Sequence, residues 1–341
     1  MKNSLIFAFT VIGTIIGAGY ATGQELFSFF IIKSNNGLWY FLFSSFLLIT
    51  MSITIFLYSK NRKIYSTENL FSNLFNKTLS KISIIISTLF LFACFCVTSA
   101  GTGSLFKESL NFPYFFGVIT IILITYAAMQ FDINGVFFIN AMLTPVIIVS
   151  ILLLGTLSLN QTHDVSSIFS NFNHTSGAFL NSLMYFGYNF LSLIPIILTS
   201  AKKVNKSTVI KGLLFSFFII LITGAVMIIS MYNTSDILET YSLPFLKIVS
   251  DISLVSKNLY TLIMYFAMIT TAVSCFFGLY QNISNVIIGR KNFIIIVCLL
   301  ISLIATLFGF SNLVRNVYSI FGIFGVFISI FMLYRIIIKN I

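Results

Sequence analysis

The residue types best suited to chemistry gather in one apolar stretch near the N-terminus. It reads VIGTIIGAGYATGQEL and contains Gly13, Gly17, Gly19 and Gly23 beside the acid Glu25. Each glycine in a helix interior costs up to about 1 kcal/mol, so we expect an interrupted helix whose freed backbone groups need partners. The stretch therefore predicts a site for a cation and for an anionic substrate group. Close helix packing through the GxxxG spacing of Gly13 and Gly17 is the alternative.

A second stretch, YFGYNFLSLIP, repeats this combination half a chain later. Gly187 lies among Tyr185, Tyr188 and Asn189, with Pro195 further on. We predict a second interrupted helix here. Paired interruptions at matching positions in two halves of a chain are typical of the binding site of a transporter.

The two stretches together predict where a substrate binds. We expect the carboxylate of a small amino acid, or of a similar polar metabolite, to meet freed amides of the first stretch. The tyrosines and asparagine of the second stretch are expected to hold the other end of the substrate. The predicted substrate-binding residues are Gly17, Ala18, Gly19, Tyr20, Thr22, Tyr185, Gly187, Tyr188 and Asn189.

Two further groups have a predicted role in coupling. Glu25 is the one acid that the pattern places inside the membrane, where acids are functional by default. It is expected to carry a proton, to contact a substrate amine or to form a gate with Arg315; a watery position near the outer interface is the alternative. The stretch ITTAVS groups the hydroxyls of Thr270, Thr271 and Ser274. Such oxygens suit sodium, although hydroxyls in membrane helices also bond to their own turn.

Composition sets the surroundings of these residues. The 341 residues are 58% hydrophobic and 8% charged, whereas soluble domains carry about 25% charged residues, so a soluble fold is excluded. The net charge of +11 is scattered between apolar runs, which argues against nucleic acid as a partner. No cofactor is expected apart from a coupling sodium ion. The cysteines lie in apolar runs without a CxxC pair, which favours buried small hydrophobes: Cys94, Cys96, Cys275 and Cys298.

The elements that position the site are membrane-spanning helices. A bilayer core about 30 Å thick requires roughly 20 apolar residues per helix. Since each half of the chain has five spans, an odd number, the second half enters the membrane from the opposite side. We predict one all-α integral membrane domain, residues 1–341, of two inverted five-helix repeats in which spans 1 and 6 are broken. The predicted spans are 4–32, 37–59, 81–106, 113–130, 135–159, 177–201, 207–232, 257–284, 291–309 and 313–338.

The limits of the repeats and of the first span follow from the same pattern. Repeat one covers about 1–160 and repeat two about 177–309, and the span 313–338 completes the bundle. The first apolar run could also be a signal peptide that is cleaved near Gly17. The apolar character that resumes at Leu26 favours an uncleaved first span.

Basic residues orient the chain, because cytoplasmic loops carry most lysine and arginine. With the N-terminus inside, all but five of the 19 basic residues lie on the inside. The five outside are Lys33, Lys107, Lys247, Lys257 and Arg315. The bias predicts a multi-pass protein of the cell membrane with both termini in the cytoplasm.

Two connecting segments are predicted to be helical. Residues 64–79 place Leu70 and Leu74 on one face, which indicates a helix on the cytoplasmic membrane surface or a plain connecting helix. Pro244, at a first-turn position before apolar residues, indicates a helix that covers the external mouth.

Several stretches carry a resemblance to a known family: IGAGYATGQELFSFF, VTSAGTGSLF, INGVFFINAMLTP, MYFGYN and ITTAVSCFFGLY. They resemble the bacterial membrane protein family called YkvI, within the amino acid, polyamine and organocation transporter superfamily. The resemblance implies the five-plus-five inverted-repeat fold of the bacterial leucine transporter. In sodium symporters of that fold, carbonyls of the first span and an Ala-x-x-Thr-Ser/Thr pattern in the eighth hold the ion. The sodium ligands implied here are Gly13, Ile16, Ala267, Thr270 and Thr271.

The resemblance has a departure that concerns the substrate. The Trp-Arg-Phe-Pro motif of neurotransmitter symporters is replaced by ATGQE at residues 21–25, so no substrate identity is carried over from those proteins.

These features predict a secondary active transporter, coupled to sodium, that moves a small amino acid or similar polar metabolite by alternating access. Spans 1, 2, 6 and 7 are expected to rock against spans 3, 4, 8 and 9. The expected partners are a small-molecule substrate and membrane lipid, and the oligomeric state is left open. The alternatives are a metabolite sensor of the same fold without net transport and proton-coupled transport through Glu25. An enzyme is not expected, because the predicted spans lack clustered acids, histidines or a nucleophile with its base.

Overall fold

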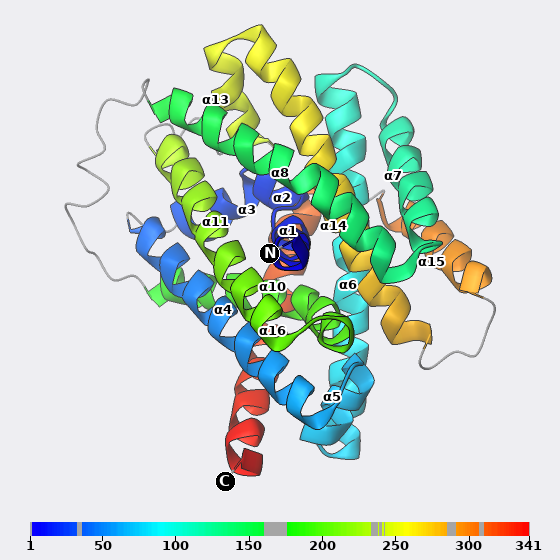
Figure 1. Cartoon of the computed structure of the whole chain (residues 1–341). Coiled ribbons are helices and arrows are strands. Elements are labelled where there is room, and N and C mark those ends of the chain that lie inside the picture. The colour runs from blue at the N-terminus through cyan, green and yellow to red at the C-terminus, as the bar shows by residue number, and fades with distance from the viewer. Residues whose placement is uncertain are drawn as a thin grey trace.

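The computed structural model of the chain describes residues 2–32, 36–159, 176–232, 238, 241, 243–284, 291–306 and 310–340. All regular structure in these residues is helical, and Figure 1 shows the helices packed into one bundle. The helices that follow the first span and form the body of the bundle are α4 (Gly37–Arg62), α6 (Lys77–Ser109), α7 (Tyr114–Met129), α8 (Asp132–Leu159), α10 (Ser176–Lys203), α11 (Lys206–Tyr232), α14 (Leu254–Ser284), α15 (Lys291–Ala305) and α16 (Phe310–Asn340).

The helices have the length and composition of a membrane protein. Among the described residues, seven helices are long and apolar enough to cross a membrane, namely α4, α6, α8, α10, α11, α14 and α16. Shorter apolar helices, Asn3–Ile15, Tyr114–Met129 and Lys291–Ile304, lie in the other predicted spans. Large apolar side chains face outward, such as Phe138 with 69% and Phe46 with 57% of its surface exposed. An apolar exterior of this kind suits lipid rather than water.

The first span is divided where its glycines lie. The backbone at Gly17 is extended, with φ −103° and ψ −158°. Gly23 has φ +80°, a left-handed conformation that glycine adopts without a steric penalty. The segments of the first span are α1 (Lys2–Ile15), α2 (Ala18–Ala21), α3 (Gln24–Leu26) and the π-helix η1 (Phe27–Ile31).

The sixth span is a continuous helix, and the interruption predicted at Gly187 is wrong. α10 is unbroken from Ser176 to Lys203 and includes both Gly187 and Pro195. Gly187 instead allows close packing, because a Cβ at this position would overlap the carbonyl oxygen of Gly322 in α16. The glycine therefore lets the backbones of α10 and α16 approach each other directly.

α1 and α10 lie at the centre of the bundle. α1 packs against α8, α11 and α14, whereas α10 packs against α4, α6 and α16. α6 and α14 also pack against each other. In α10 and α14, 83% of the most apolar stretch is buried inside the protein, compared with 33% in α8 and α16. α10 and α14 are therefore inner helices, and α8 and α16 expose more of their surface to lipid.

The segment between α4 and α6 contains a short helix, α5 (Thr67–Leu74). Its first turn is capped by Ser66, whose side chain accepts a hydrogen bond from the backbone N–H of Asn69 at 3.3 Å. Leu70 and Leu74 are buried, and α5 packs against α6. The apolar face of α5 is covered by protein, as expected for a connecting helix.

A second short helix, α13 (Pro244–Ile252), lies between α11 and α14. It has Pro244 in its first turn, as predicted. The backbone N–H of Phe245 donates to the carbonyl oxygen of Thr22 at 2.9 Å. α13 is thus tied to the divided first span, and Figure 1 shows α13 and α5 at opposite ends of the bundle.

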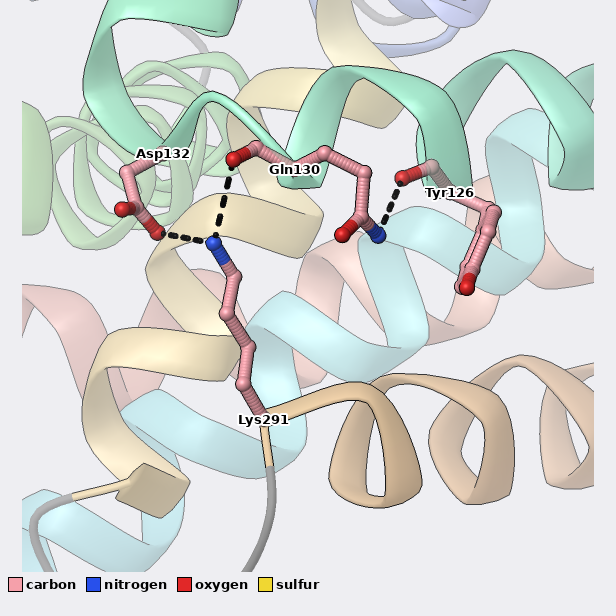
Figure 2. A network of polar contacts seen from close by, with 4 residues as sticks. All are labelled: Tyr126, Gln130, Asp132 and Lys291. Atoms are coloured by element: carbon pink, nitrogen blue, oxygen red, sulfur yellow. Dashed lines mark hydrogen bonds and ion pairs between the residues drawn. The ribbon is translucent and has the colours of Figure 1, made fainter.

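Two lysines fix helix ends to each other. The ammonium group of Lys60, near the end of α4, donates to the carbonyl oxygen of Ala201 in α10 at 2.7 Å. The ammonium group of Lys291, at the start of α15, donates to Asp132 Oδ1 at 2.8 Å and to the carbonyl oxygen of Gln130 at 3.4 Å. Figure 2 shows Lys291 reaching the corner between α7 and α8. Each contact joins helix ends that the predicted topology places on the same side of the membrane.

Candidate functional site

The first part of the site joins α1 to α14. The hydroxyl of Thr271 donates to the carbonyl oxygen of Gly13 at 2.8 Å and lies 3.4 Å from that of Thr14. A Cβ at Gly17 would overlap the Thr271 side chain. The glycine at the end of α1 therefore makes room for a hydroxyl that contacts freed backbone carbonyls.

The other predicted sodium ligands are not joined to this contact by a hydrogen bond among the described residues. The hydroxyl of Thr270 donates to the carbonyl oxygen of Ala267 at 2.9 Å, within α14 itself. Ile16 is buried, and its N–H donates to the carbonyl oxygen of Ile12 at 2.7 Å. Thr271 is thus the predicted ligand whose hydroxyl crosses to the first span, whereas Thr270 bonds to its own helix.

Asn140 of α8 is a site residue that the sequence reasoning missed. Its amide nitrogen donates to Ser274 Oγ at 3.2 Å and to the carbonyl oxygen of Val136 at 2.8 Å. Its Oδ1 is buried and makes no hydrogen bond within the described part of the chain. The oxygen faces Gly13, where a Cβ would overlap it. The available signal was a carboxamide in the middle of an apolar span.

Glu25 is the centre of the second part of the site. The residue is 4% exposed, and the hydroxyl of Tyr188 in α10 donates to its Oε2 at 2.8 Å. Its other oxygen, Oε1, lies against Gly19, where a Cβ would overlap it. The structure therefore brings together Glu25, Gly19 and Tyr188, three residues that the sequence singled out.

Aromatic rings surround the Glu25–Tyr188 contact. The ring of Tyr188 stacks on that of Tyr318 with centroids 4.7 Å apart. The Phe29 ring lies 5.6 Å from it, that of Tyr185 5.5 Å and that of Phe90 6.3 Å. We call these five residues, Phe29, Phe90, Tyr185, Tyr188 and Tyr318, the aromatic cluster.

The remaining predicted substrate residues make contacts that shape the first span and α10. Tyr20 donates its hydroxyl to the carbonyl oxygen of Ile220 in α11 at 3.0 Å. The Thr22 hydroxyl donates to the carbonyl oxygen of Gly19 at 3.1 Å, and Ala18 is buried in α2.

Two further predicted residues lie farther along the chain. The amide of Asn189 donates to the carbonyl oxygen of Tyr185 at 3.0 Å, one turn away in α10. Arg315 belongs to α16, and its side chain is outside the described structure.

A cavity with several polar side chains in its lining lies next to the aromatic cluster. Its volume is about 330 Å³, and none of its lining side chains is charged. Phe29 lines the cavity and its ring packs against that of Tyr188, the residue that bonds to Glu25, so the cavity adjoins this part of the site. The cavity is lined by Ser28, Phe29, Ile32, Asn181, Asn316, Ser319 and Ile320.

Two free cysteines lie next to the aromatic cluster. The thiol of Cys275 in α14 donates to the sulfur of Cys94 in α6 at 3.0 Å. Cys94 also lies 3.7 Å from the hydroxyl of Tyr318. The part of the chain that the structure describes contains no group of three or more histidine, cysteine or acidic residues able to hold a metal ion.

Two proteins of Bacillus subtilis (strain 168) are related to this chain along most of its length. The uncharacterized membrane protein YkvI is 24% identical over 317 residues, which cover 91% of this chain and 90% of that protein. The uncharacterized protein YyaD is 25% identical over 325 residues, with 91% and 90% covered. No protein-family model matches the chain.

Solved structures with the same fold are transporters. MhsT in complex with L-phenylalanine has a TM-score of 0.73 at 15% identity, covering 95% of this chain and 87% of that one. The Eremococcus coleocola manganese transporter has a TM-score of 0.68 at 13% identity, with 97% and 78% covered. A Na⁺-coupled sialic acid symporter has a TM-score of 0.61 at 12% identity, with 89% and 74% covered. The chain is therefore a membrane protein of the leucine-transporter fold, helical throughout its described elements, and the solved structures named here are transporters, not enzymes.

Proposed function

We propose that the chain is a secondary active transporter that moves a small amino acid, or a similar polar metabolite, by alternating access coupled to sodium. The observation that carries the proposal is the hydrogen bond from Thr271 to the carbonyl oxygen of Gly13. It directs a hydroxyl of α14 at the freed backbone of a divided span, and such carbonyls coordinate coupling ions in transporters. The shared fold with a Na⁺-coupled symporter supports this assignment.

The proposed sodium ligands are oxygens on three helices. Gly13 contributes a carbonyl from α1 and Ile16 one from the residue directly after α1, whereas Thr270, Thr271 and the carbonyl of Ala267 belong to α14. The buried Oδ1 of Asn140 in α8, which makes no hydrogen bond within the described residues, adds a further acceptor beside Gly13. A cation between these helices would be held by neutral oxygens alone, which suits weak, reversible binding.

We further propose that the fold consists of two inverted repeats, about 1–160 and 177–309, completed by the span 313–338. The first half has the order first span, α4, α5, α6, α7, α8, and the second half α10, α11, α13, α14, α15, α16. The packing pairs correspond when the halves are exchanged: α1 with α11 matches α10 with α4, and α1 with α8 matches α10 with α16. The positions of α5 and α13 at opposite ends support the inversion (Figure 1).

The proposed transport cycle moves α1, α4, α10 and α11 against α6, α7, α14 and α15. We place the chain in the cell membrane with both termini in the cytoplasm, as the distribution of basic residues favours. The 330 Å³ cavity then opens toward the outside, because it lies between η1, the start of α10 and the start of α16. The proposed substrate site lies below it, where α2 and α3 face α10.

The sodium proposal is tested by the thermal unfolding midpoint of the purified protein in detergent. We expect sodium chloride to raise the midpoint above the values in potassium or choline chloride, because a ligand of the folded state stabilises it by mass action. Thr271→Ala is expected to lose this response. Thr156→Ala is the matched control, since Thr156 is exposed and bonds only to its own helix. A wild-type protein without any sodium response contradicts sodium coupling.

Proton coupling through Glu25 is the second candidate, because its carboxylate is buried within the first span. In that case pools of amino acids stabilise the protein without sodium, to an extent that changes with pH, and Glu25→Gln removes the pH dependence. A sodium response that persists unchanged in Glu25→Gln favours sodium coupling instead.

A further inference from the structure

The Glu25 carboxylate lacks a compensating charge among the described side chains. The ion pairs in this part of the chain are Lys247 with Asp251 and Lys291 with Asp132, all partly exposed. Among the described residues, the Glu25 carboxylate accepts a hydrogen bond from the hydroxyl of Tyr188. Removal of a carboxylate from water costs roughly several kcal/mol of free energy, unless a nearby charge or several hydrogen bonds compensate for the lost hydration. The site is therefore suited to a ligand that brings a positive charge.

The aromatic cluster also favours a ligand with a positive charge. The faces of phenyl and phenol rings carry negative electrostatic potential, so they attract an ammonium group and disfavour an anion. Tyr188 donates its hydroxyl to Glu25 and is flanked by the rings of Phe29 and Tyr318. A carboxylate bonded to one member of an aromatic cluster is a suitable environment for an ammonium group.

The position of Glu25 also determines the orientation of the ligand. Its Oε1 lies against Gly19, in the segment where the sequence suggested that freed amides meet a substrate carboxylate. Two neighbouring carboxylates repel each other, and one of them would have to take up a proton. An anionic end of the substrate is therefore directed away from Gly19, toward the neutral amides and hydroxyls that line the 330 Å³ cavity.

Phe29 links the cavity to the residues around Glu25, because it lines the cavity and its ring packs against that of Tyr188. It belongs to the π-helix η1, and π-helical turns are rare and are frequent at functional sites. The cavity volume of about 330 Å³ lies in the range of sites for small molecules, roughly 300–1,000 Å³. A small amine fits the cavity by volume, and Phe29 would have to move for the amine to reach Glu25.

On the basis of the transport function proposed above, we propose that Glu25 and the aromatic cluster bind the ammonium group of the substrate. The site thus recognises an amine whether or not the molecule also carries a carboxylate. The substrate class is an amino acid or a small primary amine, with the ammonium group at Glu25 and the remainder in the polar cavity.

The test compares three sets of molecules, each an amino acid, the amine that lacks its carboxylate and the acid that lacks its amino group. The sets are alanine, ethylamine and propionate; leucine, isoamylamine and isocaproate; and phenylalanine, phenethylamine and hydrocinnamate. Each compound is titrated against the purified full-length protein in sodium-containing detergent buffer, and the unfolding midpoint gives an apparent Kd. We expect at least one amine and its parent amino acid to bind, and the matching carboxylate without nitrogen to have no effect.

Variants assign the response to Glu25. Glu25→Gln is expected to weaken amine binding at least tenfold, since hydrogen bonds to charged groups contribute about 1.5–3 kcal/mol. Asp132→Asn is the matched control, because it removes an exposed carboxylate that pairs with Lys291 far from the aromatic cluster. Tyr188→Phe removes the hydroxyl donor to Glu25 and remains informative if Glu25→Gln does not fold. It is expected to change amine affinity while carboxylates still fail to bind.

The possible outcomes separate the inference from the transport proposal. Binding of a carboxylate without its amine, or full amine affinity in Glu25→Gln, overturns the ammonium site and leaves the transporter proposal intact. No response of the wild-type protein to any amine also overturns the ammonium site. Absence of a sodium response as well contradicts the sodium-coupled function separately.

Discussion

At the scale of single residues, three glycines of the first span each lie against polar side chains. An added Cβ at Gly13 would overlap Asn140 and Thr144, one at Gly17 would overlap Thr271, and one at Gly19 would overlap Glu25. The glycines therefore admit side chains from α8, α14 and α3 to the backbone of the divided span. The lack of a side chain at these glycines allows close contact with neighbouring side chains, as well as freedom of the backbone conformation.

Alanine at two of these glycines is predicted to separate the two parts of the site. Gly17→Ala displaces Thr271 and is expected to abolish the sodium response, whereas amines still bind in sodium-free buffer. Gly19→Ala displaces the Glu25 carboxylate and is expected to weaken amine binding at least about tenfold while sodium still stabilises. The measurement is the ligand-dependent shift of the unfolding midpoint.

Gly177→Ala is the control for both variants, because no atom lies within 4 Å of a Cβ at that position. It is expected to behave as the wild-type protein. Loss of both responses in Gly17→Ala and Gly19→Ala alike contradicts a division of the site into two parts.

A different prediction concerns Gly23, which is required for the backbone conformation rather than for ligand binding. Its φ of +80° costs a residue with a Cβ roughly 1–2 kcal/mol. Gly23→Ala is therefore expected to lower the unfolding midpoint equally with and without ligands. A normal midpoint in this variant would show that the turn between α2 and α3 relaxes without cost.

At the scale of elements, the sequence distinguished the positions of helices better than their continuity. The ten apolar runs coincide with helical segments because apolar length and loop charge are local properties. Gly17 and Gly187 both lie in apolar runs and have polar residues as neighbours in the sequence. Gly17 nevertheless lies at a break in the first span, whereas Gly187 lies within a continuous helix. What distinguishes them is the partner: Thr271 faces Gly17, and the backbone of α16 faces Gly187.

The contact between α10 and α16 leads to a prediction at this scale. Gly187→Ala places a methyl group against the carbonyl oxygen of Gly322, and overpacking of this kind costs about 1–3 kcal/mol. We expect a lower unfolding midpoint, with the affinities for sodium and amines unchanged. Unchanged stability combined with altered ligand affinity would instead identify Gly187 as a hinge.

The same limit explains which candidate site residues the sequence singled out. Glu25, Tyr188 and Thr271 were singled out because acids and clustered polar groups are rare in apolar runs, and their role in a site stays a prediction. Asn140 was not singled out, because its contacts depend on α8 lying beside α1 and α14, a long-range arrangement that no local pattern contains.

At the scale of the whole molecule, the proposed topology predicts which surfaces an impermeant thiol reagent reaches. Asp251→Cys on α13 is expected to react in intact cells, and Asp132→Cys at the corner of α7 and α8 only after the cells are permeabilised. The background is low, because three native cysteines are buried, and Cys298→Ser removes the partly exposed one. Labelling of both positions in intact cells contradicts the proposed topology.

The thiols of Cys94 in α6 and Cys275 in α14 are adjacent, so a disulfide between them would link the two halves of the chain. Oxidation by copper(II) phenanthroline forms this disulfide: two copper(II) complexes each accept one electron, and the two thiols release two protons. A chain with a protease site inserted between residues 160 and 175, cleaved after oxidation, should migrate as one band without reductant and as two fragments with it. Cys94→Ser should give two fragments in both lanes. If the single band persists when sodium or an amine is bound during oxidation, α6 and α14 stay together while the rest of the bundle responds.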